Sequence, residues 1–210
     1  IGIGTNAPSS TVEIAGSNTG VVIELSSWDA DTVGSTGFIR FQKSASNTIQ
    51  TFSATGDGEW LGSLGFYGSD SSSTASQQSA YINVIQDGSA SSAQVASYMA
   101  FGTGTSSASA IERMRIKSDG MIELNSAGGA IDHGFIFDGN AVDYHIGLDD
   151  TADDLVIGRG TALGTTIAIS IDGTTGHIGL GATDHDSVHV YVNGTAASGS
   201  AAGLQIADVL

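Results

Sequence analysis

Apolar and polar residues alternate along most of this chain, in short runs separated by Gly, Ser, Asn and Asp. A period of two places the apolar side chains on one face of a β-strand and the polar ones on the other. No stretch shows the 3.6-residue period of an amphipathic helix, so we expect an all-β protein with little or no helix. The clearest alternation lies at residues 38–41, 81–84, 114–116, 135–137, 167–171 and 188–192.

A short motif occurs near both ends of the chain. Residues 1–4 read I-G-I-G and residues 178–181 read I-G-L-G, and each copy leads into an alternating segment, with one extra residue in the second. Residues 114–125 match part of the unit that ends in the second copy, around Gly120 and Gly176. Such self-similarity indicates a repetitive architecture. Because the first copy starts inside the unit, we expect the chain to be a piece of a longer protein.

The composition divides the chain into three segments. Residues 1–20 form a half-repeat with a Ser/Asn/Gly linker, 21–125 an aromatic-rich β module, and 126–210 an Asp/Gly-rich β module that ends in the second repeat. Ten of the 14 aromatic residues lie between Trp28 and Phe101, which marks the middle segment as the better candidate for a core or a ligand surface. The low-complexity stretches at 69–76 and 102–110 are typical of loops or hairpin tips.

Many short strands leave many exposed edges, which invite aggregation unless they are paired or covered. Winding three copies around one axis would close these edges and bury the apolar faces. We therefore expect an elongated homotrimeric fibre, similar to a β-helix or β-prism, with strand pairing between chains.

The charge excludes some partners. With 22 acidic and six basic residues, the formal net charge is −16. Nucleic acid and anionic membranes bind through basic clusters, so neither is an expected partner. Cysteine is absent, which excludes disulfides and thiolate metal sites. No apolar run approaches the ~20 residues of a membrane span, so we expect no membrane insertion.

Several motifs resemble the repeated modules of phage tail fibres. They are G-F-I-R-F at residues 37–41, G-E-W-L-G-S-L-G-F-Y-G-S-D at 58–70, M-A-F-G-T at 99–103, E-R-M-R-I at 112–116 with Gly120, and Y-H-I-G-L-D-D at 144–150 with L-V-I-G at 155–158. The I-G-I-G-T-x-x-P start at Ile1 is also similar. The resemblance implies a trimeric β-structured segment of a virion tail fibre that contacts the host surface. Such modules are often followed by a self-cleaving chaperone domain.

We therefore expect a structural and adhesive protein, not an enzyme, with no cofactor, no metal and no catalytic residue. Host polysaccharide is the expected ligand besides the other copies of the chain. Flat aromatic rings can stack on pyranose C–H faces, and the candidates for this are Trp28, Trp60 and Tyr67. Packing in a core is the competing explanation for each of them.

Two other functions remain open. A tailspike-type depolymerase needs two carboxylates roughly 5–9.5 Å apart, and Asp57, Glu59 and Asp70 near Trp60 and Tyr67 are its candidate sources. A cellular surface filament or adhesin could be built from the same repeats.

The remaining motifs favour structural roles. Asp149, Asp150, Asp153 and Asp154 lack the spacing of a Ca²⁺ loop, as does Asp184-His185-Asp186. A ring of His177 or His189 about a threefold axis could bind a transition metal, but packing is the more common role.

Alternating Arg113, Arg115 and Lys117 should share one strand face and pair with nearby acids such as Glu112, Asp119 or Glu123. Asn193-Gly194-Thr195 is a formal glycosylation sequon, but Asn-Gly favours a turn. Gly2-x-Gly4-x-x-Ala7 lacks the helix that a dinucleotide site requires.

Overall fold

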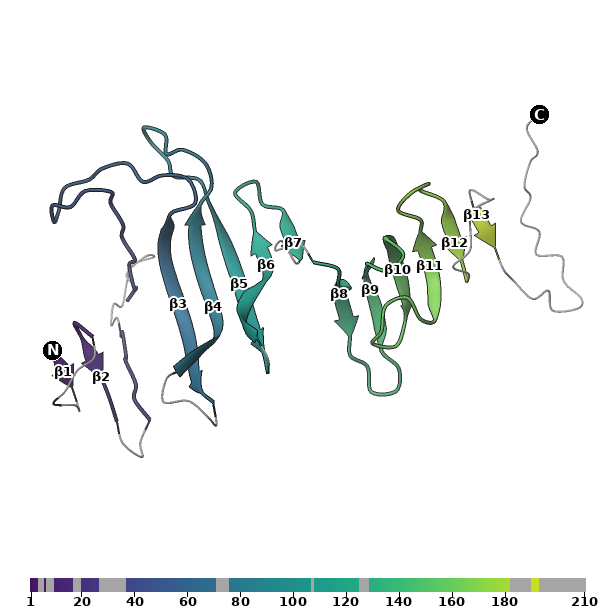
Figure 1. The fold of residues 1–210 in the computed structure, drawn as a ribbon, viewed down its shortest axis with the longest axis horizontal. Helices are drawn as coiled ribbons and strands as arrows, with labels where there is room; N and C mark the ends of the chain where they lie inside the picture. The colour runs from purple at the N-terminus through teal and green to yellow at the C-terminus, as the bar shows by residue number, and fades with distance from the viewer. Residues whose placement is uncertain are drawn as a thin grey trace, which may run out of the picture. The chain divides into compact units, whose positions relative to one another are not determined.

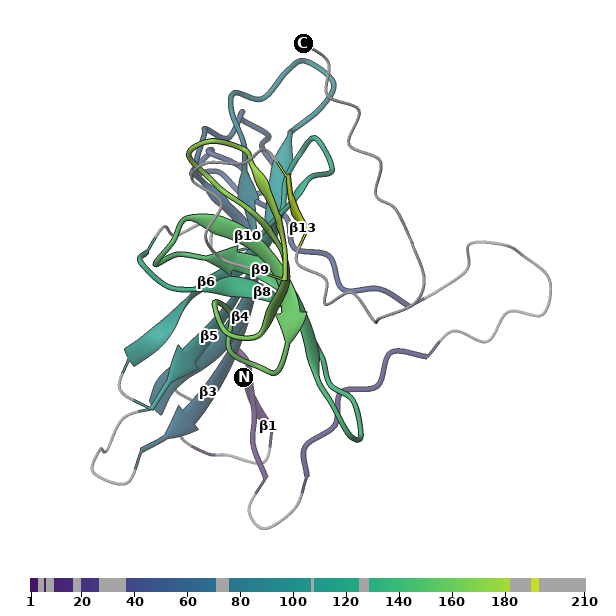
Figure 2. The ribbon, with the colours of Figure 1, turned by 90° about the vertical axis from the view of Figure 1, so that its right-hand side faces the viewer.

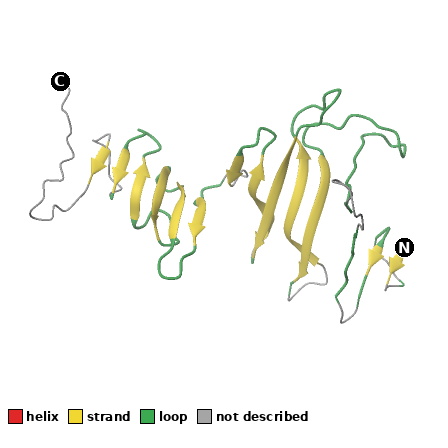
Figure 3. Ribbon diagram, turned by 180° about the vertical axis from the view of Figure 1, so that it is seen from behind, coloured by secondary structure: helices red, strands yellow, loops and turns green. Residues whose placement is uncertain are grey.

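The computed structural model describes residues 1–3, 6, 10–16, 20–26, 37–70, 76–106, 108–124, 129–181 and 190–192. All the regular structure in these residues is β-strand, and none of it is helix (Figure 3). The prediction of an all-β protein is therefore confirmed. Among the described residues there is also no helix long and apolar enough to cross a membrane.

The chain divides into two compact units, Ile1–Gln42 and Lys43–Leu210. The first unit contains the short parallel pair of β1 (Gly2–Ile3) and β2 (Glu13–Ile14). The second unit contains two larger sheets, one on each side of the segment boundary predicted at 125/126. The predicted segment boundaries themselves stay predictions.

The first large sheet has five antiparallel strands that follow one another in chain order (Figure 1). Seen end-on in Figure 2, β3 to β6 fan out, as the twist of a β-sheet requires. Of the low-complexity stretches at 69–76 and 102–110, residues 69 and 76 are strand ends, and residues 102–105 and 108–110 belong to the two strands of one hairpin and not to a loop. The strands are β3 (Trp60–Ser69), β4 (Ser76–Gln86), β5 (Ser97–Thr105), β6 (Ala108–Ile116) and β7 (Ile122–Leu124).

The second large sheet has six strands, also in chain order. All neighbouring strands are antiparallel except the last pair, which is parallel. The strands are β8 (His133–Phe137), β9 (Tyr144–Asp149), β10 (Asp154–Arg159), β11 (Ile167–Ile171), β12 (Ile178–Leu180) and β13 (Val190–Val192).

Each repeat seen in the sequence forms the same local structure in both of its copies. β6 and β7 make a hairpin in which Ile116 pairs with Ile122, and β11 and β12 make one in which Ile171 pairs with Ile178. Each turn contains a glycine with left-handed φ, 87° at Gly120 and 71° at Gly176. The I-G-I-G and I-G-L-G motifs form β1 and β12, and each pairs in parallel with the strand that follows it. Paired residues are 11 positions apart in the first copy, as in Gly2 with Glu13, and 12 apart in the second, as in Ile178 with Val190, which matches the extra residue.

One face of the five-stranded sheet is apolar across all of its strands. Residues that pair directly lie on the same face of a sheet, so the register assigns each side chain to a face. One row of this apolar face runs Leu64, Ile82, Phe101, Met114, Leu124, with one residue from each strand. A second row contains Val84, Met99, Ile116 and Ile122.

The six-stranded sheet repeats this design. One row of its apolar face runs Phe135, Ile146, Ile157, Ile169, Leu180, and another runs His133, Leu148, Leu155, Ile171, Ile178. A hollow of about 340 Å³ on this face is lined by His133, Phe135, Ile146, Leu148 and Leu155, among other residues.

The opposite face of the six-stranded sheet is lined by small residues and is covered by the chain's own loop. Gly134, Gly147 and Gly179 pair across it with Val156 and Ser170. The β10–β11 loop folds onto this face, since a methyl group on Gly147 would lie 2.4 Å from Leu163 Cδ2.

The two apolar faces have no such cover in the described structure. The substantial contacts between strands all lie within a sheet. Of the described apolar side chains, only Ile85, Ala100 and Val156 are buried. Large side chains on both apolar faces are instead exposed, including Phe66 at 54% and Phe137 at 62%. The described part of a single chain therefore lacks the buried core that normally holds sheets together.

Not every alternating run forms a strand. Residues 38–41 belong to no strand in the described part of the chain, so the strand predicted there is wrong for the single chain. Phe38, Ile39 and Phe41 are exposed, and Arg40 lies over the Phe38 ring at 5.4 Å. Alternation selects an extended backbone, but a strand also needs a neighbour with which to bond. At 188–192 the structure describes only β13, so residues 188 and 189 lie outside the described part.

Candidate ligand-binding surface

The second face of the five-stranded sheet is polar and carries most of the predicted ligand residues. One row across it consists of Ser63, Asn83, Ala100, Arg115 and Glu123, and the neighbouring row of Gly65, Tyr81, Gly102 and Glu112. The Ser63 hydroxyl donates to Asn83 Oδ1 at 2.7 Å, and Asn83 is only 2% exposed. Hydroxyl, amide and aromatic groups thus share this face with a charged cluster.

One bulge in β3 places Trp60 on the polar face, where Tyr67 already lies. The residues are seven positions apart on β3, so simple alternation would put them on opposite faces. Leu61 is the extra residue of this bulge, and it sets Trp60 opposite Ile85, which follows Tyr81 and Asn83 on the polar face of β4. Tyr67 alternates regularly with Gly65, and a second bulge, with Ser79 as the extra residue of β4, brings Gln78 opposite Tyr67. Trp60 is 54% exposed and Tyr67 is 63% exposed. Neither ring is packed in a core, so both residues remain candidates for stacking on a sugar. The third candidate, Trp28, lies outside the described residues.

Trp60 and Tyr67 are too far apart to share one sugar. They lie near opposite ends of β3, a separation of roughly 20 Å at the usual rise per residue. Any ligand contacts that they make belong to two separate places on the polar face.

The Trp60 end of the face is held by the amide of Gln86, which is fully buried. Gln86 Nε2 donates to the carbonyl oxygens of Thr55, at 3.0 Å, and Gly88, at 2.8 Å. Its Oε1 accepts a hydrogen bond from the Thr55 hydroxyl. These bonds fix the turn that leads into β3, and so the backbone beneath Trp60.

The basic residues of β6 are paired with acids. Arg115 binds Glu112 through Nε at 2.5 Å and Nη2 at 3.1 Å, and Lys117 Nζ lies 3.1 Å from Glu123 Oε1. Arg115 also lies over the Tyr98 ring at 4.3 Å. These bonds raise the pKa of Arg115 and of Lys117 above their ordinary values. The cluster is consistent with the expected pairing and not with a free basic spot for an anionic glycan.

The strict alternation predicted for Arg113, Arg115 and Lys117 is wrong at Arg113. Arg113 is the extra residue of a bulge, because Met114 pairs with Phe101 and Glu112 pairs with Gly102. Lys117, directly after β6, still binds Glu123, the residue that pairs with Arg115. The bulge breaks the period of two, which the sequence alone gives no means of locating.

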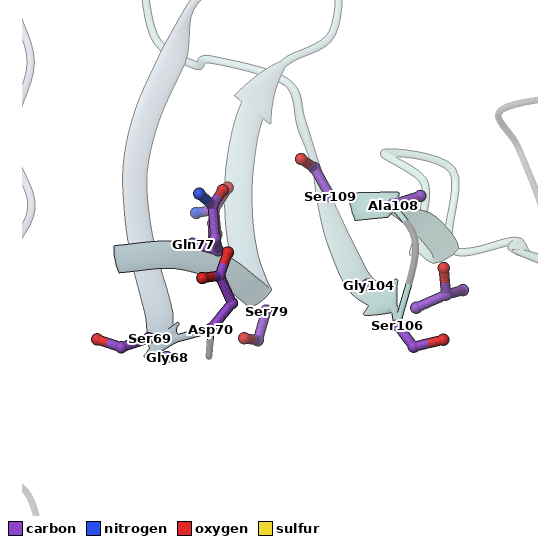
Figure 4. Close-up of a pocket in the computed structure, with 11 residues that line it drawn as sticks. Gly68, Ser69, Asp70, Gln77, Ser79, Gly104, Ser106, Ala108 and Ser109 are labelled. Atoms are coloured by element: carbon purple, nitrogen blue, oxygen red, sulfur yellow. The ribbon is translucent and has the colours of Figure 1, made fainter. Parts of the chain in front are cut away.

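A polar pocket of about 550 Å³ lies at the Tyr67 end of the sheet (Figure 4). It is formed where the β3–β4 and β5–β6 hairpins end. Asp70 is the one titratable side chain among its described lining residues, and the other polar side chains are hydroxyls and amides. The lining consists of Gly68, Ser69, Asp70, Gln77, Gln78, Ser79, Gly104, Thr105, Ser106, Ala108 and Ser109.

Asp70 does not converge with the other two carboxylates considered for a depolymerase. Asp57 Oδ1 accepts the Gly88 N–H at 2.6 Å, and Glu59 Oε2 lies 3.4 Å from Lys43 Nζ. Asp70 lies at the other end of the ten-residue strand β3, a distance of roughly 30 Å. A pair that includes Asp70 therefore cannot flank one glycosidic bond.

The acidic residues around the β9–β10 turn act on the backbone. Asp149 Oδ1 accepts from Thr151 N–H, and Asp154 Oδ1 accepts from Gly173 N–H, each at 3.1 Å. Asp149 and Asp154 also pair with one another in register. No group of three or more potential metal ligands occurs within the described part of the chain. Residues 184–186, with their Asp-His-Asp motif, lie outside it.

The histidines have different surroundings. His145 is 1% exposed; its Nδ1 lies 3.0 Å from the Gly160 carbonyl oxygen, and its buried Nε2 has no hydrogen-bond partner. His177 is half-buried, just before β12, and belongs to no group of three or more potential metal ligands among the described residues. His189 and the Asn193-Gly194-Thr195 motif lie outside the described residues. Gly2 lies in a strand and not at the start of a helix, as expected.

The sequence predicted the stacking residues but not the pocket beside Tyr67. Its lining comes from two low-complexity hairpin tips, whose Ser and Gln residues carry no pattern that distinguishes a site from a loop. The sequence matches no protein-family model and no curated protein.

Proposed function

We propose that this chain is a structural and adhesive segment of a phage tail fibre, located in the virion and assembled as a homotrimer. The observation that supports this most strongly is that two sheets each leave one continuous apolar face uncovered. Together with the fibre-like sequence motifs, this favours a protein whose core forms between chains. Its function is then mechanical and adhesive.

The uncovered area is large enough for a stable interface. Free aromatic side chains present roughly 150–250 Å², so at the observed exposures the two faces offer on the order of 1,000 Å². Stable interfaces bury about 800 Å² per partner. An exposed apolar patch of this size is unusual for a monomer.

Other copies of the same chain are the occupant that fits best. Both sheets present the same arrangement, and the same hairpin forms the β6–β7 and β11–β12 parts of it. A surface that repeats along one chain is matched by a partner that repeats in the same way, as in symmetric assemblies of identical chains. Rotation about a common axis would also cover the unpaired edges of β3 and β8.

Assembly would leave the polar face of the five-stranded sheet available for ligands. Three copies would then present three equal sets of weak contacts to the host surface. Such multivalency can raise the apparent affinity by roughly 10²–10⁴-fold without any new contact. This is how a fibre segment without a deep apolar pocket could hold a polysaccharide.

Neighbouring residues on opposite faces provide the test. Phe66 and Tyr67 are adjacent on β3 and similarly exposed, but only Phe66 lies on the apolar face. Phe135 and Ile136 form the corresponding pair on β8, with exposures of 54% and 50%. Native mass spectrometry of Phe66→Asp and Phe135→Asp should show loss of the trimer, because each change places a charge in the interface.

The matched variants Tyr67→Asp and Ile136→Asp should keep the trimer mass. Far-ultraviolet circular dichroism of all four variants shows whether each still contains β-structure. Equal effects from both members of a pair would exclude the apolar faces as the interface. A monomeric parent protein would overturn the whole proposal.

A further inference from the structure

We propose that the polar pocket at the Tyr67 end of the five-stranded sheet binds a neutral oligosaccharide, with the Tyr67 ring as its stacking platform. This deepens the adhesive function proposed above and rests on it. The inference depends on three observations: the position of the ring, the chemistry of the pocket lining, and their connection through Gln78.

The Tyr67 ring is held against the sheet. A methyl group on Gly65 would lie 2.8 Å from Tyr67 Cε2, so the ring occupies the space that a side chain at position 65 would fill. The side chain is nevertheless 63% exposed. One side of the ring thus rests on the strand while the other remains open, which is the arrangement that a stacked pyranose needs.

Gln78 connects this ring to the pocket. It pairs with Tyr67 across β3 and β4, and its Nε2 would lie 3.2 Å from the same methyl group on Gly65. Gln78 is also part of the pocket lining. A ligand stacked on Tyr67 can therefore extend past the Gln78 amide into the pocket.

The lining favours a ligand with many hydroxyl groups and no charge. Serine and threonine hydroxyls and the amides of Gln77 and Gln78 both donate and accept hydrogen bonds. Figure 4 shows Asp70 and Gln77 together on one side of the space and Ser109 on the other. Among the described lining residues there is no Lys, Arg or His to bind a phosphate, sulfate or carboxylate. Apolar small molecules are also disfavoured, since their sites are lined mostly by hydrophobic side chains.

The size of the pocket agrees with this assignment. Its volume of about 550 Å³ lies within the range of roughly 300–1,000 Å³ that is usual for small-ligand sites. A short oligosaccharide fits, with one residue on Tyr67 and the next in the pocket. Its open, polar lining indicates weak binding at a single site, which a trimer would strengthen by avidity.

The test is saturation-transfer NMR and calorimetry on the intact chain with maltotriose and N,N′-diacetylchitobiose as neutral probes and 3′-sialyllactose as the anionic one. At least one neutral probe should bind, and Tyr67→Ala and Gln78→Ala should each weaken that binding at least tenfold. Tyr67→Phe should keep the affinity within about threefold, because the stacking surface remains. Phe52→Ala, at an exposed aromatic residue in the segment before β3, serves as the matched aromatic control and should leave the affinity unchanged.

The result that would overturn the inference is absence of binding by both neutral probes, preference for the anionic probe, or binding that Tyr67→Ala and Gln78→Ala do not weaken. The native mass of the same samples separates this outcome from failure of the proposed function. A trimer without sugar binding contradicts only the site, whereas sugar binding by a monomer contradicts only the assembly.

Discussion

At the scale of single residues, close contacts with glycine fix the positions of several side chains. The Tyr81 ring lies where a side chain at Gly102 would be, since a methyl group there would come within 2.3 Å of it. The His145 ring likewise lies where a side chain at Gly158, its partner across β9 and β10, would be. These glycines are needed for the space above them and not for backbone freedom.

Gly158→Ala should therefore lower the free energy of unfolding by about 1–3 kcal/mol, the usual effect of overpacking. A methyl group at this position would lie 2.5 Å from His145 Nε2 and 2.9 Å from the Thr166 carbonyl oxygen. Urea denaturation followed by circular dichroism measures the change. Gly56→Ala is the control, since no atom lies within 4 Å of the added methyl group and its stability should not fall.

Gln86→Met should be destabilising by about 2 kcal/mol, because it leaves the buried carbonyl oxygen of Thr55 and the half-buried one of Gly88 without their donor. The replacement keeps the length of the side chain, so cavity formation contributes little. The same denaturation experiment tests it against Gln77→Met at an exposed position. Similar small effects from both changes would show that the buried amide does not hold the Trp60 end of the sheet.

Tyr81 should ionise above the ordinary tyrosine range on alkaline titration. Burial, and then the Glu112 carboxylate, raise the pKa of its hydroxyl. A raised pKa means that the folded state favours the neutral form, so this stabilisation is complete below the ordinary tyrosine pKa of about 10 and is lost as pH rises above it. Absorbance at 295 nm of the parent and Tyr81→Phe should differ by a late-titrating component. Identical titration curves would contradict the assigned environment.

At the scale of elements, the sequence predicted where strands form but not all of their partners. Alternation was sufficient at residues 81–84 and 167–171, because each run pairs with its neighbour in the chain. It failed at 38–41, which pairs with no strand among the described residues. The bulge that brings Trp60 to the same face as Tyr67 could not be read from composition, since it depends on the register with β4.

The two repeated hairpins give a prediction at this scale. Gly120→Ala and Gly176→Ala should each cost about 1–2 kcal/mol, because both residues have positive φ, which an L-residue with a Cβ adopts at that cost. No neighbouring atom lies within 4 Å of either position, so the effect is purely conformational. Thermal unfolding should show similar losses for both variants. Unequal losses would mean that the two hairpins are not structurally equivalent.

At the scale of the whole molecule, charge and apolar surface act in opposite directions. Each chain has a net charge of −16, so copies repel one another at low ionic strength. Salt shortens the Debye length from about 30 Å at 0.01 M to about 8 Å at 0.15 M. The trimer should thus become more resistant to dilution as NaCl is raised, which sedimentation velocity can measure. Assembly weakened by salt would indicate that ion pairs, not apolar faces, join the chains.

The central claim is that the apolar faces are completed by other copies of the chain. Sedimentation equilibrium of the unmodified protein over a wide range of dilution tests it most directly. We predict a single species with three times the chain mass of 21.1 kDa. A well-folded species with the mass of one chain, stable at every concentration, would contradict the account.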